Sequence, residues 1–183
     1  MTEVDEKILQ LINGKDTLEQ GFKLLMDTYQ KRLYHYIRSI VNSHEDTDDI
    51  LQNTFLKAFK SLNKFEKRSG LYSWLYRIAS NETYSFLKKK NKHTVVLDAK
   101  NKELSALAGD QGTYLEGEAI KNMLIKAMKG LPPKQKMVFS LRYFEEKSYK
   151  EISRILGTSV GALKASYFHA IKKIEDYLKT YTI

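Results

Sequence analysis

The chain has 183 residues, of which 42% are hydrophobic, so it can form one ordinary domain or two small ones and is not a disordered polypeptide. Its formal net charge of +9 favours a polyanionic partner such as nucleic acid. Cysteine is absent, which excludes disulfides, thiolate zinc sites and cysteine nucleophiles. The acidic start and the lack of a run of ~20 apolar residues predict no signal peptide and no membrane insertion, so we expect a cytoplasmic protein.

Apolar residues at steps of three and four recur along almost the whole chain and predict an all-α fold. The first helices are predicted over residues 4–13, over 17–41 and from residue 45 onward, the third opening on the acidic stretch EDTDD. We expect Val4 on the inner face of the first helix and Phe59 on that of the third.

Residues 70–90, GLYSWLYRIASNETYSFLKKK, predict a helix with two different faces. Leu71, Leu75 and Ile78 belong to its apolar stripe, whereas the opposite, exposed face is expected to carry Tyr76 and Arg77 before a run of lysines. That face is either a set of amphipathic tyrosines beside a solvated basic end or a platform for stacking unpaired bases. The helix alone leaves both interpretations open.

Residues 93–118 have weak periodicity, several glycines and mostly acidic charge, which predicts a flexible linker with at most a short helix around 102–107. The linker divides the chain into two predicted small helical domains, residues 1–92 and 119–183. Helical periodicity returns at Ala119, and Pro132 and Pro133 separate one helix from the next, predicted over 133–144.

The C-terminal segment predicts a helix-turn-helix. Ser148 and Glu151 form a capping box for a short helix, Gly157 begins a tight turn, and Ser159 is a second N-cap. In this layout the second helix enters the major groove of DNA. Its exposed face is expected to carry the residues Lys164, Ala165, Phe168, His169, Lys172 and Lys173.

Motifs for catalysis or cofactor binding are missing from the sequence, which contains no phosphate-binding loop, zinc-protease motif or nucleophile elbow. The aspartates near residue 48 are not a calcium loop, because Leu51 replaces the required glycine and Lys57 the chelating glutamate. We therefore predict no catalytic residues, no metal, no cofactor and no enzyme activity.

Three stretches carry a family likeness: DTDDILQNTFLKAF, then FEKRSGLYSWLYRIASNETYSFLKKK, then LPPKQKMVFSLRYFEEKSYKEISRILGTSVGALKASYFHAIKKIEDYL. They resemble regions 2 and 4 of a bacterial RNA polymerase sigma factor of the small extracytoplasmic-function (ECF) branch, over nearly the whole chain. The resemblance implies a factor that binds core RNA polymerase, directs promoter-specific initiation and is controlled by an anti-sigma factor. The alternatives are a stand-alone helix-turn-helix regulator and a basic RNA-associated protein.

The resemblance also implies roles for individual residues. Contacts to the clamp helices of the polymerase's largest subunit are implied for Asp48, Asp49, Gln52, Asn53 and Leu56. Tyr76, Arg77 and Lys88 would hold the single-stranded minus-10 element. A flipped base of this element would enter a pocket formed by the loop Lys67, Arg68, Ser69, Gly70 and Leu71, and Asn81 would help to specify that base.

The duplex minus-35 element would be read by Lys164, Phe168, His169 and Lys172, with Lys150 and Ser159 placed for phosphates. The sequence departs from the family's commonest pattern here, because Ser166 and His169 stand where arginines are usual and Ala162-Leu163 replaces a Thr-Val pair. Bidentate guanine recognition is therefore reduced, and the minus-35 sequence itself is not predicted.

Overall fold

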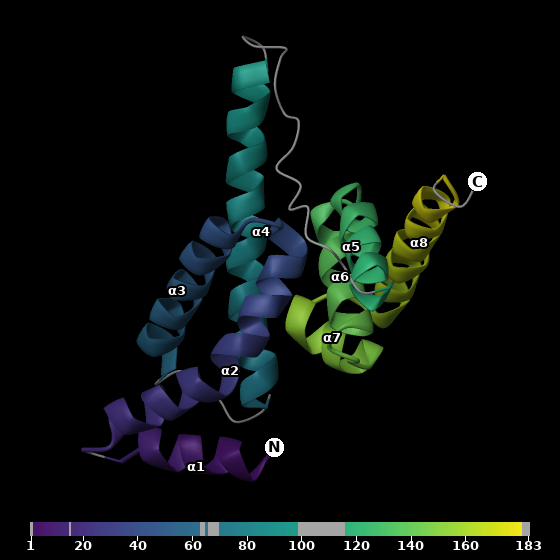
Figure 1. Ribbon diagram of the computed structural model, residues 1–183. Helices are drawn as coiled ribbons and strands as arrows, with labels where there is room; N and C mark the ends of the chain where they lie inside the picture. Colours follow the sequence, from purple (N-terminus) through teal and green to yellow (C-terminus); the bar gives the residue numbers. More distant parts are fainter. Residues whose placement is uncertain (1, 15, 63–64, 66–69, 99–115, 181–183) are drawn as a thin grey trace.

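The computed structural model describes residues 2–14, 16–62, 65, 70–98 and 116–180, and these contain helices and no strand (Figure 1). The predicted all-α class is confirmed. The helices are α1 (Glu3–Ile12), α2 (Leu18–Val41), α3 (His44–Ser61), α4 (Leu71–Asp98), α5 (Glu116–Lys129), α6 (Pro133–Tyr143), α7 (Tyr149–Leu156) and α8 (Val160–Lys179). Among the described residues, no helix is long and apolar enough to cross a membrane.

Helices α1 to α4 form the first helical group, in which α1 and α3 each pack on α2, and α4 packs on both α2 and α3 (Figure 1). Helix α2 ends because Asn42 adopts the left-handed conformation with φ 59°, and Ser43 then caps α3 by accepting a hydrogen bond from the Asp46 amide at 3.2 Å. This short reversal lays α3 back along α2. The fully buried core includes Leu33 and Leu75.

Helices α5 to α8 form the second group, in which α8 packs on α5, α6 and α7. Met128, Phe139 and Ile174 belong to one apolar cluster within it. The capping box predicted for α7 is present, because the Ser148 hydroxyl accepts from the Glu151 amide and the Glu151 carboxylate accepts from the Ser148 amide at 2.8 Å.

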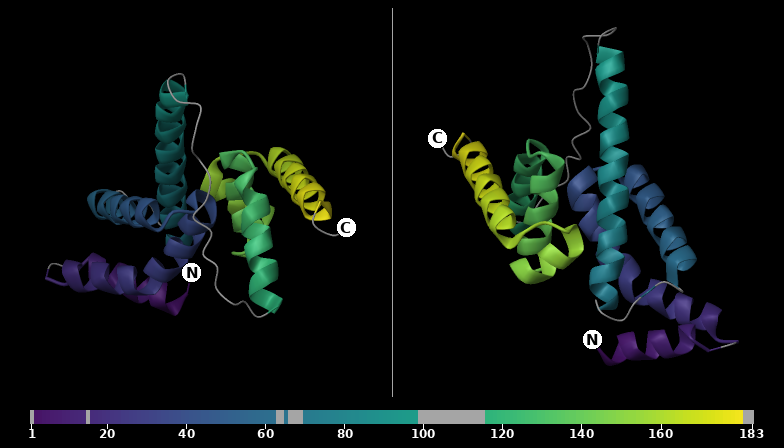
Figure 2. Two further views of the ribbon diagram at one scale, coloured as in Figure 1. Left: turned by 45° about the horizontal axis from the view of Figure 1, so that its top comes forward. Right: turned by 180° about the vertical axis from the view of Figure 1, so that it is seen from behind.

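The two helical groups touch. Helix α7 lies against α4, and α6 against α2, as the front and rear views both show (Figures 1 and 2). One apolar cluster runs from Leu33 and Leu75 in the first group to Leu141, Ile152 and Leu163 in the second. In this structure the groups therefore share a continuous core, an arrangement that the predicted linker did not suggest.

The faces of three helices differ from the sequence prediction. Val4 and Phe59 were expected to face inward but are 44% and 47% exposed, whereas Leu9 is buried. Tyr76 was expected on an exposed face but is fully buried. The reason is tertiary: α4 contacts α2 and α3 on one side and α6 and α7 on another, so it has two buried faces.

The ends of α4 and α5 also differ from the sequence prediction. Helix α4 continues to Asp98, where the prediction had already placed linker, and α5 begins at Glu116 rather than Ala119. The short helix predicted around 102–107 lies outside the described residues.

Candidate nucleic-acid and partner interfaces

Helix α3 presents a line of exposed side chains opposite its buried face. Asp48 and Asp49, Gln52 and Asn53, and then Leu56 follow one another at helical spacing, and all five are exposed. Thr54 and Ala58, which are fully buried, point the other way and fix the rotation of the helix. The predicted partner-binding residues therefore do lie on one accessible surface.

Four of these five residues line a groove of about 540 Å³ between α2 and α3. Asn53 is exposed on the same helix but does not line it. Leu56 is 51% exposed, and Phe59, also 47% exposed, contacts Phe22 edge-to-face with ring centroids 5.0 Å apart. The groove is completed by residues that the sequence prediction missed or assigned to the core: Phe22, Met26, Gln30, Leu51, Phe55 and Phe59.

A groove that combines half-exposed apolar side chains with acidic and amide groups is suited to a helical partner. The carboxylate of Asp48 lies 3.0 Å from Nδ1 of His44, and Asp49 places a second carboxylate beside it. These carboxylates favour a partner with basic residues around an apolar strip.

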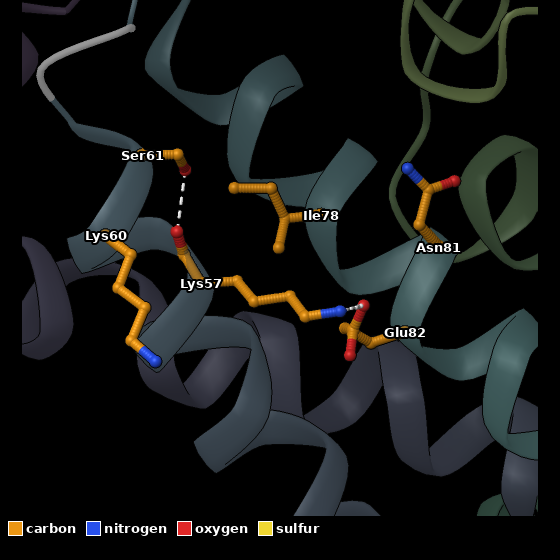
Figure 3. A pocket seen from close by; sticks show the side chains of 6 residues that line it. All are labelled: Lys57, Lys60, Ser61, Ile78, Asn81 and Glu82. Atoms are coloured by element: carbon orange, nitrogen blue, oxygen red, sulfur yellow. Dashed lines mark hydrogen bonds and ion pairs between the residues drawn. The ribbon is translucent and has the colours of Figure 1, made fainter.

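A second pocket, of about 430 Å³, lies between the end of α3 and the middle of α4 (Figure 3). Lys57 reaches across it to Glu82, with Nζ 2.5 Å from Oε1, and Ile78 faces the space between the helices. Of the predicted minus-10 residues Asn81 lines this pocket, with its amide directed away from the Lys57–Glu82 pair. The sequence prediction missed four polar lining residues: Lys57, Lys60, Ser61 and Glu82.

Polar residue types make up five of the six residues that line the pocket, and Ile78 is the apolar one, a combination that suits a single planar base with hydrogen bonds at its edge. Gly70 is exposed just before α4, whereas Leu71 is fully buried as the first residue of that helix. Leu71 therefore packs rather than lining the base pocket, and residues 67–69 of the predicted loop lie outside the described residues.

The α4 residues predicted to hold the single-stranded minus-10 DNA do not share one environment. Lys88 is exposed, but Tyr76 is buried and stacks on Tyr72 with ring centroids 4.0 Å apart. Burial and the nearby Glu145 carboxylate raise the pKa of Tyr76, so its hydroxyl stays protonated. The side chain of Arg77 donates from Nε to the main-chain carbonyl of Arg154 at 3.1 Å.

The helix-turn-helix has the predicted geometry. Gly157 ends α7 with φ 64°, a left-handed conformation that glycine adopts without steric cost, and the Ser159 hydroxyl then caps α8 by accepting from the Ala162 amide at 3.4 Å. Ile152, Ile155 and Leu163 are buried between and beneath the two helices.

All six predicted minus-35 residues are exposed. Lys164, Phe168 and Lys172 follow at steps of four on one face of α8, with His169 beside them. Phe168 is 64% exposed, the highest value among the large hydrophobic side chains of the described residues. An aromatic ring held between lysines on the outer face of such a helix can contact thymine methyl groups and sugars while the ammonium groups bind phosphate.

The described residues contain no group of three or more potential metal-binding side chains. The fold and these surfaces together define a class, a two-part helical DNA-binding protein of transcription. Sequence comparison then gives the family: a sigma-70 region 2 family model matches residues 25–93, and a sigma-70 region 4 family model matches residues 121–174. The chain belongs to the sigma-70 family and is an ECF sigma factor, which directs core RNA polymerase to promoters.

Curated relatives match along nearly their whole length. The chain is 27% identical to an ECF RNA polymerase sigma-E factor of Haemophilus influenzae over 183 residues, covering 96% of this chain and 95% of the relative. It is 26% identical to that of Escherichia coli (strain K12), covering 94% and 93%. A region 2 match ahead of the helix-turn-helix disfavours the stand-alone regulator that the sequence left as an alternative.

Solved structures show the same architecture. The sigma factor RpoE from Bartonella quintana, solved in complex with the anti-sigma factor NepR, is 26% identical, with a TM-score of 0.69 over 86% of this chain and 96% of that one. CnrH, solved with the cytosolic domain of CnrY, shares the fold with the same TM-score of 0.69 at 20% identity, covering 97% of this chain and 99% of that one.

Proposed function

We propose that this sigma factor binds the clamp helices of core RNA polymerase through the α2–α3 groove. The groove itself carries the proposal, because it places half-exposed Leu56 and Phe59 beside exposed Asp49 and Gln52. Because these apolar side chains are only half exposed, leaving the groove open costs the free protein little stability, and a helical partner that covers the groove buries the remaining apolar surface.

The two DNA-binding roles follow from the other surfaces. The α3–α4 pocket takes a flipped base of the minus-10 element, with Asn81 at its edge and Lys57 and Lys60 nearby for the backbone. The outer face of α8 reads the minus-35 duplex through Phe168 and its neighbouring lysines. Residues 1–92 and 119–183 are the corresponding functional domains.

The remaining assignments concern cellular context. Because RpoE of Bartonella quintana was solved with an anti-sigma factor and resembles this chain over most of its length, we assign an anti-sigma partner to this protein as well. The factor acts in the cytoplasm, where the polymerase and the chromosome are, and contributes binding surfaces rather than catalysis.

A pull-down of purified core RNA polymerase tests the groove assignment. The double variant Asp49→Arg, Gln52→Ala should lose core binding, because it reverses a charge and removes an amide at the groove. Glu45→Arg is the matched control, since it makes the same charge change on an exposed side chain of α3 outside the groove. Retention of core binding by the double variant, with folding verified by circular dichroism, would overturn the assignment.

A further inference from the structure

His44 lies where the reversal between α2 and α3 meets the α2–α3 groove. It is the first residue of α3, and its side chain is 75% exposed. Its ring nitrogen Nδ1 is 3.0 Å from the carboxylate of Asp48, which lines the groove, and 3.1 Å from the hydroxyl of Tyr34 on α2. His44 therefore joins a groove residue of α3 to the neighbouring helix.

Tyr34 holds the imidazole ring in place from α2. The two rings meet edge-to-face, with centroids 5.7 Å apart and planes inclined at 84°. Tyr34 also contacts the ring of His35 on its own helix, with centroids 5.8 Å apart. Because an edge-to-face aromatic pair is a favourable contact, His44 has a defined position although most of its side chain is open to solvent.

A single nitrogen atom of His44 faces two groups with different hydrogen-bonding requirements. The ionised Asp48 carboxylate can only accept, so Nδ1 must carry a hydrogen to bond to it. The Tyr34 hydroxyl can donate, and Nδ1 accepts from it only when it carries no hydrogen. The neutral ring can keep its hydrogen on Nε2 and accept from Tyr34, whereas the imidazolium ion cannot accept at Nδ1 and pairs with Asp48.

Three helices bring charged or titratable groups to this corner of the described structure: Tyr34, His35 and Arg38 on α2, Glu45, Asp46, Asp48 and Asp49 on α3, and Lys90 on α4. Asp46 is paired with Lys90 at 2.6 Å. Asp48 is the carboxylate that forms an ion pair with His44. A positive charge on His44 consequently acts most strongly on Asp48, because the interaction falls off with distance.

Pairing with His44 changes the surface that the groove presents to a partner. Asp48 is 56% exposed and supplies, with Asp49, the negative charge of the groove. An imidazolium ion 3.0 Å away offsets the charge of Asp48 and holds its carboxylate toward the start of α3. A neutral His44 leaves the full negative charge of Asp48 for the basic residues of a partner.

We propose that His44 is a positioning residue of the α2–α3 groove, which sets the charge and orientation of Asp48 according to its own protonation. This role depends on the proposed binding of core RNA polymerase in the groove. Histidine side chains change charge between about pH 5 and pH 8, so core binding weakens as the pH falls through this range. Both side chains of the pair are more than half exposed, and the effect on the Kd is therefore about threefold.

A fluorescence titration of labelled sigma factor with core RNA polymerase at pH 6 and pH 8 tests this role. The wild type should show a Kd about threefold higher at pH 6 than at pH 8, beyond the change that His44→Gln shows, because glutamine cannot take up a proton. The ratio of the wild type to the variant removes the titration of the polymerase itself. Circular dichroism at both pH values verifies that each protein is folded.

Three further variants separate this role from a purely structural one. His44→Arg places a permanent cation beside Asp48 and should bind core about threefold more weakly than the wild type at pH 8. Asp48→Asn removes the partner, so it should lose the pH dependence as His44→Gln does. His35→Gln is the matched control, since it removes an exposed histidine that contacts Tyr34 and should keep the wild-type pH dependence.

The outcomes distinguish the role of His44 from the proposed function. Equal pH dependence of core binding in the wild type and His44→Gln overturns the role of His44 and leaves the groove assignment intact. Wild-type pH dependence in Asp48→Asn, its loss in His35→Gln, or undiminished binding by His44→Arg at pH 8 also overturns it. Failure of the wild type to bind core at either pH overturns the proposed function and, with it, the role of His44.

Discussion

Truncation of the two half-exposed apolar residues on α3 should weaken polymerase binding with little effect on the fold. Fully burying a leucine or phenylalanine side chain stabilises by about 1.5–3 kcal/mol. Because Leu56 is 51% exposed and Phe59 47% exposed, only about half of that gain remains for a partner to supply. Each truncation therefore costs roughly 1 kcal/mol of binding, and Leu56→Ala with Phe59→Ala together should raise the Kd about 30-fold.

The assay is a fluorescence titration of labelled sigma factor with core RNA polymerase. Phe59 also contacts Phe22 edge-to-face, so its truncation should lower the free energy of unfolding by about 1 kcal/mol, which denaturant titration measures separately. Phe168→Ala removes an even more exposed aromatic from α8 and should leave the Kd for core within about twofold. A double variant that is folded and binds core as tightly as the wild type would refute the assignment of the groove.

Three further predictions concern stability and DNA binding. Ser148→Ala should lower the free energy of unfolding by about 1 kcal/mol at neutral pH. Hydrogen bonds from Ser148 lower the pKa of Glu151 in the folded state, so their contribution to stability is present above the unfolded value near 4.5 and is lost as the pH falls through the folded pKa. Urea titrations should therefore show a smaller difference between variant and wild type at pH 3 than at pH 7, and an equal difference at both would contradict this prediction. Leu75→Ala should cost about 2–5 kcal/mol, since the side chain is fully buried, and a loss under 1 kcal/mol by thermal or urea unfolding would show that the site collapses freely. Lys172→Ala should reduce the slope of log K against log salt for promoter duplex binding by about 1, whereas an unchanged slope would remove Lys172 from the phosphate contacts.

Local sequence signals specified much of the second helical group. The Ser148–Glu151 capping box, the turn at Gly157 and the Ser159 cap all occupy their predicted positions. These features depend on hydrogen bonds between residues three or four positions apart, so neighbouring sequence contains the information needed to place them.

The exposed surfaces of α3 and α8 could also be predicted, although less completely. The exposed line from Asp48 to Leu56 follows from the helical period, but Phe59 was assigned to the core because periodicity marks an apolar stripe without fixing its width. The polar lining of the α3–α4 pocket was missed because it depends on contacts between two helices. Lys57 and Glu82 meet across two helices, and nothing local to either residue indicates the other.

The sequence by itself determined the all-helical class, the order of the helices, the helix-turn-helix and the resemblance to sigma factors, because these depend on period, capping and motif spacing within short stretches of chain. Only the tertiary structure decided that Tyr76 is buried and that Glu145 meets Arg32, since the first follows from packing of α4 against other helices and the second from packing of α2 against the second helical group. A helix whose sequence shows one apolar face can bury a second face when another helix packs on it. Which helix packs there depends on the folded chain and not on the local sequence.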